Sequence, residues 1–165
     1  MTTAIRRARP GDEAEITEMI YELATFEHAV DQCTVTESQM QTALFGPNPT
    51  AHAHVAEVDG QIAAGAVWYL SFSTWDGQAG IYLEDLFVRP AFRRRGLARA
   101  LMRELAFECL ANGYTRLTWA VLDWNVDAIA LYEEVGGKPL NEWITYRVSG
   151  LALSDLAESD RAESD

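Results

Sequence analysis

The fold of this chain is decided by the stretch Leu86-Phe87-Val88-Arg89-Pro90-Ala91-Phe92-Arg93-Arg94-Arg95-Gly96-Leu97-Ala98. An apolar strand runs into a basic loop, and an amphipathic helix is predicted from about 97 to 111, with Leu101, Leu105 and Leu110 on its buried side. The first turn of a helix has free backbone N–H groups and the positive end of the dipole, so it binds anions. Gly96 and Ala98 keep that turn open to a ligand. The stretch therefore predicts an anion site, and it is not a Walker-type loop because no Gly-Lys-Ser/Thr follows.

Outward from this stretch, hydrophobic periodicity and turn residues predict the remaining elements. Strands are expected over 4–9, 52–58, 61–72, 80–88, 115–121 and 143–148, and helices over 12–28, 36–45, 97–111 and 127–135. The order β-α-α-β-β-β-α-β-α-β indicates an α+β fold with a central mixed sheet flanked by helices. One domain at 1–150 is expected. Residues 151–165, where Ala-Glu-Ser-Asp occurs twice, are expected to form an acidic, disordered tail.

Composition narrows the function classes. The chain has 165 residues, 48% hydrophobic and 23% charged, and no apolar run long enough to span a membrane. Its net charge of −12 argues against nucleic acid; the acidity either favours a cationic partner or only maintains solubility. Two cysteines and three histidines lack metal-ligand spacing, and the N-terminus lacks a signal-peptide core. A cytoplasmic protein without a metal is expected.

Residues 86–98 resemble the central motif of the GNAT acetyltransferase superfamily, an apolar strand followed by Arg/Gln-x-x-Gly-x-Gly/Ala at the start of a long helix. Asn125 and Tyr132 resemble its second motif. The strings at 22–27, 82–88 and 123–125 are most similar to the diamine (spermidine/spermine) and thialysine acetyltransferases. The resemblance implies a GNAT fold, a homodimer and acetyl-CoA as co-substrate. The acetyl-CoA contacts that it implies are Leu86, Phe87, Val88, Arg93, Arg94, Arg95, Gly96, Leu97, Ala98, Arg99, Asn125, Asp127, Ala128 and Tyr132.

Direct acetyl transfer to an amine in a ternary complex requires a base, an oxyanion donor and an acid. Glu84 is the candidate base, and its neighbour Asp85 points to the opposite face unless a bulge intervenes. The backbone N–H groups of 86–88 are candidate oxyanion donors. Tyr132 is the candidate acid for the leaving thiolate. The competing interpretations are that the carboxylates pair with an arginine and that Tyr132 only packs.

The acceptor is expected to be a small cationic amine, bound by acidic and aromatic side chains. The candidates are Phe26, Glu27, Trp75, Glu84, Asp85, Glu142 and Trp143, although both tryptophans are equally compatible with packing. Ser73 replaces an acidic residue of the diamine enzymes, which leaves polyamines, short diamines and thialysine-like amino acids open; Asp76 is a possible replacement. The alternatives are a protein N-acetyltransferase and a non-catalytic acetyl-CoA sensor.

Overall fold

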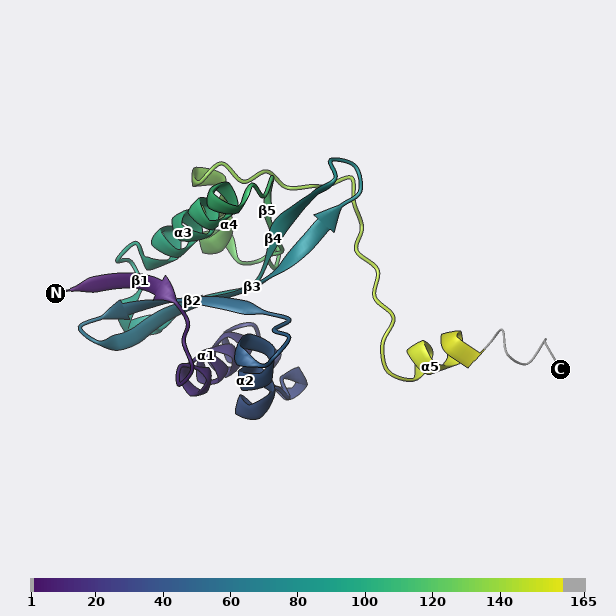
Figure 1. The fold of residues 1–165 in the computed structure, drawn as a ribbon, viewed down its shortest axis with the longest axis horizontal. Coiled ribbons are helices and arrows are strands. Elements are labelled where there is room, and N and C mark those ends of the chain that lie inside the picture. Colours follow the sequence, from purple (N-terminus) through teal and green to yellow (C-terminus); the bar gives the residue numbers. More distant parts are fainter. Residues whose placement is uncertain (1, 159–165) are drawn as a thin grey trace. The chain divides into compact units, whose positions relative to one another are not determined.

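Residues 3–119 contain one five-stranded sheet, in the order β1-β2-β3-β4-β5 (Figure 1). Its strands are β1 (Thr3–Arg7), β2 (His52–Val58), β3 (Gln61–Ser73), β4 (Gln78–Val88) and β5 (Leu117–Trp119). All pairings are antiparallel except that of β4 with β5, which is parallel. The sheet is therefore mixed, and the prediction of an α+β fold is confirmed.

The computed structural model describes residues 2–158. The chain forms two compact units, the first ending at Leu131 and the second beginning at Tyr132. The helices are α1 (Glu13–Phe26), α2 (Glu37–Phe45), α3 (Leu97–Asn112), α4 (Val126–Glu134) and α5 (Leu151–Glu158), with short 3-10 turns η1 (Val30–Gln32) and η2 (Pro90–Phe92). Within those residues, no helix has the length and apolar character needed to cross a bilayer.

Helices α1 and α2 cover one face of the sheet, and α3 covers the other (Figure 1). The core under α1 and α2 joins Ile16 and Met19 of α1 to Val55, Val67 and Phe87 of the sheet. Helix α1 approaches β3 so closely that a Cβ at Gly65 would lie 2.7 Å from Met19 Cε. This contact fixes the height of α1 above β3, the strand that pairs with the one carrying the candidate base.

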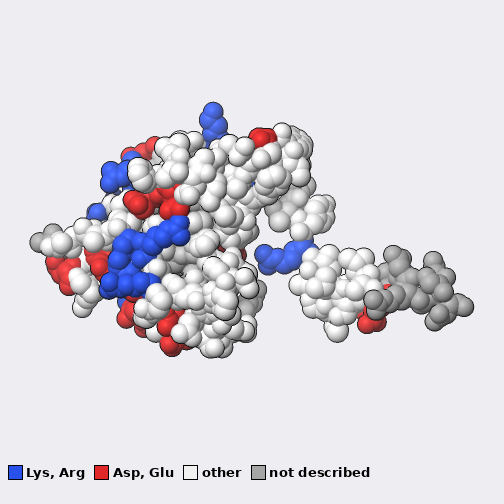
Figure 2. Space-filling model, in the orientation of Figure 1, with Lys and Arg blue, Asp and Glu red and all other residues white. Residues whose placement is uncertain are grey.

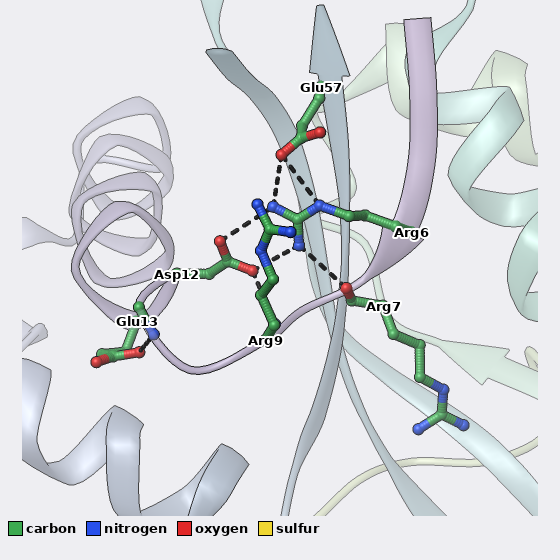
Figure 3. A network of polar contacts seen from close by, with 7 residues as sticks. Arg6, Arg7, Arg9, Asp12, Glu13 and Glu57 are labelled. Atoms are coloured by element: carbon green, nitrogen blue, oxygen red, sulfur yellow. Dashed lines mark hydrogen bonds and ion pairs between the residues drawn. The ribbon is translucent and has the colours of Figure 1, made fainter. Parts of the chain in front are cut away.

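Two arginines fix α1 laterally. Arg6 of β1 donates to Asp12 at 2.7 and 3.1 Å and to Glu57 of β2 at 2.5 and 3.0 Å, and so ties the start of α1 to two strands (Figure 3). Arg89, directly after β4, donates to three glutamates of α1, namely Glu15 at 2.7 Å, Glu18 at 2.6 Å and Glu22 at 2.9 Å. Helix α1 is thus held at its start by β1 and β2 and along its length by the end of β4.

A β-bulge interrupts the pairing of β3 with β4. Val67 pairs with Asp85 and the next residue, Trp68, pairs with Leu83, so Glu84 has no residue opposite it. A bulge changes which residues of the strand face each side of the sheet. This bulge is what allows Glu84 and Asp85 to serve one pocket.

Most predicted elements are confirmed within a few residues, and Thr36 forms the N-cap of α2 in a capping box. The prediction that Leu110 is buried was wrong, because it is 80% exposed while Cys109 and Met102 face the core. The buried stripe of α3 runs through Leu97, Leu101, Leu105 and Cys109 at intervals of four, which turns Leu110 outward.

The prediction of a strand at 143–148 was also wrong, since these residues form no strand in the structure. A strand is stabilised by pairing with a neighbour, and the described part of the second unit contains no other strand. Helix α5 occupies residues where an irregular tail was expected. The remainder of that tail, 159–165, lies outside the described residues.

Candidate active site

The predicted anion site lies at the N-terminus of α3. Gly96 is the N-cap with φ 76°, and no side chain caps the helix, so the first-turn N–H groups face outward. The surroundings of Gly96 are open, and a Cβ there would meet no atom within 4 Å. Glycine is therefore required by the left-handed backbone rather than by a lack of space. Arg94, two residues earlier, also has a positive φ, 62°.

Arg93 and Arg95 of the loop lie against different parts of the structure. Arg93 lies over the rings of Phe26, at 5.1 Å, and Phe87, at 5.7 Å, and its Nε donates to the carbonyl of Val88 at 3.1 Å. Arg95 lies over Phe92 at 5.4 Å. Arg93 is thus directed toward β4 and the end of α1, whereas Arg95 lies against η2 (Pro90–Phe92).

Strand β4 has an open edge next to this loop. Strand β5 pairs only with residues 81–83, while β4 continues to Val88. The N–H of Arg89 donates to Ala63 of the β3 side at 3.0 Å. Since antiparallel partners alternate in direction, the N–H groups of Leu86 and Val88 point the other way, toward the edge that β5 leaves open. Two backbone donors therefore face the space beside the start of α3.

Three carboxylates gather where α1 ends and β4 bulges. Asp85 faces the α1 side of the sheet, as does its partner Val67, and it lines a largely apolar cavity with Met19 and Phe87. Burial, with the neighbouring charges of Glu84 and Glu27, raises the pKa of Asp85 to about 6. Burial also raises the pKa of Glu27, the C-cap of α1. Among the described residues of the first unit, 2–131, no ion pair involves these three side chains.

Aromatic side chains surround these carboxylates. Phe26 lies against Trp124 with ring centroids 5.6 Å apart, and His28 lies 6.1 Å from the same indole. Tyr69 and Tyr82 stack at 5.1 Å, and burial, with the charge of Glu84, raises the pKa of the Tyr69 phenol. Sequence reasoning found Phe26 but missed Trp124, Tyr69 and Tyr82. The string Asp123-Trp124-Asn125 drew attention only to Asn125, and the tyrosines become neighbours through the pairing of β3 with β4.

Asn125 begins helix α4. Its side-chain Oδ1 accepts from the N–H of Ala128 at 3.3 Å, and its carbonyl accepts from Ile129 at 3.0 Å. These bonds are those of an N-cap. Asn125 therefore sets where α4 starts and, with it, the position of Asp127 and Ala128 on the first turn.

Some candidate residues are not brought to this place within the first unit. Trp75 lies in the β3–β4 turn, 88% exposed and about 20 Å along the hairpin from the Val67–Asp85 pair at 3.3 Å per residue. Ser73 accepts from the N–H of Trp75, and Asp76 bonds to Thr115 and Arg116. The Asp76 carboxylate is therefore engaged by the two residues directly before β5. Tyr132, Glu142 and Trp143 belong to the second unit, so their roles stay predictions.

Residues 17–137 match the model of the acetyltransferase (GNAT) family. This chain belongs to the GNAT family. It is therefore an N-acetyltransferase. GNAT acetyltransferases use acetyl-CoA as their co-substrate.

Similar proteins agree with this assignment. A thialysine N-epsilon-acetyltransferase of Mus musculus is 36% identical, over 94% of this chain and 98% of its own length. One of Caenorhabditis elegans is 38% identical, over 90% and 93%. Among solved structures, an integron cassette protein from the mobile metagenome of V. cholerae has a TM-score of 0.80 at 23% identity, covering 96% of this chain and 99% of its own. That structural likeness supports the GNAT fold alone.

Proposed function

We propose that this GNAT enzyme transfers the acetyl group of acetyl-CoA to the primary amine of a small cationic acceptor, either a thialysine-like amino acid or a short di- or polyamine. Relatives named as thialysine N-epsilon-acetyltransferases support the amine class. A human spermidine/spermine N(1)-acetyltransferase-like protein, 29% identical over 93% of this chain and 23% of its own length, supports the polyamine arm.

The observation that carries the proposal is the group of three carboxylates at the end of α1. Asp85, Glu84 and Glu27 lie near enough for their charges to raise the pKa of Asp85. An ammonium group bound among them would relieve this repulsion, and Phe26 and Trp124 add aromatic faces that attract cations. A neutral or anionic acceptor would gain nothing comparable.

The donor would be held from two sides. The first-turn N–H groups of α3 and the basic side chains of Arg94 and Arg95 would bind the pyrophosphate. The open edge of β4 would bind the acyl arm, with the N–H groups of Leu86 and Val88 directed to it. The thioester would then lie close to Glu84, as direct transfer requires.

In the proposed reaction, the carboxylate of Glu84 accepts a proton from the bound ammonium, directly or through a water. The freed amine forms a bond to the thioester carbon, and the N–H groups of Leu86 and Val88 stabilise the negative charge on its oxygen. Collapse breaks the carbon–sulfur bond and gives the acetylated amine. Tyr132 donates its phenolic proton to the departing thiolate. The attacking nitrogen loses its second proton on collapse, and this proton reaches the Tyr132 phenolate through solvent, while the first passes from Glu84 to bulk water.

We further propose a cytoplasmic homodimer. The segment 143–148 exposes Ile144 and Tyr146 by 77% and 88%. A second copy of the chain would cover these apolar side chains. The two free cysteines, Cys33 and Cys109, stay reduced in the cytoplasm.

The experiment that tests the function measures release of CoA thiol from acetyl-CoA with thialysine, lysine, ornithine, putrescine, spermidine, an aminoglycoside and a lysine peptide. We expect turnover with one of the small amines and none with the peptide. Glu84→Gln and Tyr132→Phe should each lower kcat at least 100-fold while CoA binding, measured by calorimetry, persists. Acetylation of the peptide alone would indicate a protein acetyltransferase, and binding without any turnover would indicate a sensor.

A further inference from the structure

Arg93 is placed differently from the role that the family motif gives it. As the first residue of the motif it was expected to contact acetyl-CoA, yet its guanidinium lies over Phe26 and Phe87 and donates to the carbonyl of Val88. None of these partners belongs to the loop itself. Phe26 is the last residue of α1, Phe87 lies in β4, and Val88 ends that strand.

We infer that Arg93 is a positioning residue, a latch that joins the acetyl-CoA loop to the acceptor side of the site. This inference rests on the proposed function for the identity of the two ligands. Its physical basis is the planar guanidinium, which lies over two rings and donates from Nε at the same time. A lysine at this position would keep the charge but would lose the planar contact and the Nε donor.

The contact with Val88 places the latch next to the reacting groups. The N–H and the carbonyl of Val88 point to the same open edge, because both groups of one residue share a direction in an antiparallel strand. Arg93 occupies that carbonyl with a donor. It thereby fixes the end of β4 where the N–H of Val88 is available to a ligand.

The contact with Phe26 extends the latch to the acceptor side. Phe26 also lies against Trp124, so Arg93, Phe26 and Trp124 form a continuous row from the loop to the segment before α4. Glu27, one of the three carboxylates, follows Phe26 directly. A shift of the loop on binding the donor would therefore be transmitted to the place where the acceptor ammonium binds.

Arg93 also stabilises the backbone conformation of the loop. Arg94 has a left-handed conformation, which is unfavourable for a residue with a side chain and persists only when its surroundings hold it. Arg93 supplies that hold directly before the turn. Without it, the approach to the α3 N-terminus would relax and the N–H groups would lose their common direction.

The test removes the contact by changing Arg93 or Phe26, and asks whether the two losses of CoA affinity are independent. Arg93→Lys, Phe26→Leu and the double variant are prepared, and CoA affinity is measured by calorimetry without any amine. We expect each single variant to bind CoA about fivefold more weakly, and the double variant to be no weaker than either single one. The acceptor KM should rise in the same three variants, with kcat lowered less than the acceptor KM is raised.

If Arg93 only contacted a phosphate of CoA, Arg93→Lys would barely change CoA affinity, and Phe26→Leu would leave it unchanged. Either that pattern or additive losses in the double variant would overturn the latch. Arg94→Lys is the matched control; it should change CoA affinity without changing the acceptor KM. Because Phe26 is 37% exposed, its truncation should leave the thermal midpoint near that of the wild type. The CoA arm needs no amine, so a wrong acceptor class would not obscure its result.

Discussion

Asp85 shows how one strand residue acquires unusual chemistry. Regular alternation would put Glu84 and Asp85 on opposite faces, and the sequence alone left that conflict open. The bulge resolves it by leaving Glu84 without an opposite residue while Asp85 keeps its place beside Val67 on the α1 side. Asp85 is then buried next to like charges, and its pKa rises to about 6.

Asp85→Asn should therefore stabilise the free enzyme in a pH-dependent way. The folded protein holds a proton on Asp85 up to about pH 6, whereas the unfolded chain loses it near 3.8, so ionisation costs stability as the pH rises through this window. Above pH 7 the variant should be more stable than the wild type by roughly 3 kcal/mol, and below pH 4 the two should be equal. Urea unfolding at pH 4, 6 and 8 measures the difference, and a gap that is the same at all three pH values would contradict the assignment.

At the scale of elements, α1 depends on Arg89 more than on its own capping. Asp12 is its N-cap without a side-chain cap bond, and the glutamates Glu15, Glu18 and Glu22 converge on one guanidinium. Arg89 also donates to the carbonyl of Ile62 at 3.2 Å. The helix that carries Phe26 and Glu27 is thus fastened to the end of the strand that carries Glu84.

Arg89→Met should lower the free energy of unfolding by about 2 kcal/mol, because three neighbouring carboxylates lose their shared cation and one carbonyl loses a donor. Adding Glu18→Gln to this variant should recover part of the loss by removing one repelling charge. Arg103→Met, an exposed arginine of α3, is the control for loss of a positive charge. Equal unfolding free energies for the Arg89 and Arg103 variants would show that the three ion pairs contribute nothing.

Most elements were predictable because each is encoded locally. Thr36 and Gly46 bracket α2, Asp59-Gly60 marks the β2–β3 turn, and the basic loop marks the start of α3. The residue that is buried at the end of α3 was not predictable. Leu110 fits the apolar pattern of a core residue, but Cys109 occupies that position in the structure. Contacts such as Arg93 with Phe26 join residues 67 positions apart, and no local pattern encodes them.

At the scale of the first unit, both charge signs occupy the surface, and a buried histidine, His54, lies on the α3 side of the sheet. Figure 2 shows basic side chains gathered in a band with acidic ones beside it. Buried on this side, Trp68 donates to His54 Nδ1 at 3.1 Å, and His52 lies over Trp68 at 4.5 Å. Arg7 of β1, which is exposed, forms an ion pair with Glu108 of α3 next to them. Burial lowers the pKa of His54 to about 4. Arg7 and His52 act in the same direction, and the negative charge of Glu108 opposes them.

This cluster should make the whole fold sensitive to acid. Between pH 6.5 and about 4 the unfolded chain binds a proton at His54 and the folded protein does not, so stability falls as the pH falls, by about 2 kcal/mol at pH 5. His54→Gln keeps an acceptor for Trp68 and should flatten this part of the pH dependence. His28→Asn, at an exposed position with φ 59°, should not. Thermal midpoints of the three proteins from pH 7 to pH 5 provide the comparison.

The bulge in β4 separates the proposed base from the scaffold that holds it. If Glu84 were removed, Leu83 and Asp85 would become adjacent, and each would already face the side that regular pairing demands, opposite Trp68 and Val67. Both ladders of the strand would close without turning any other side chain. Geometrically, Glu84 is a one-residue insertion in an otherwise regular pairing, so deleting it should remove the proposed base while β3 and β4 still pair.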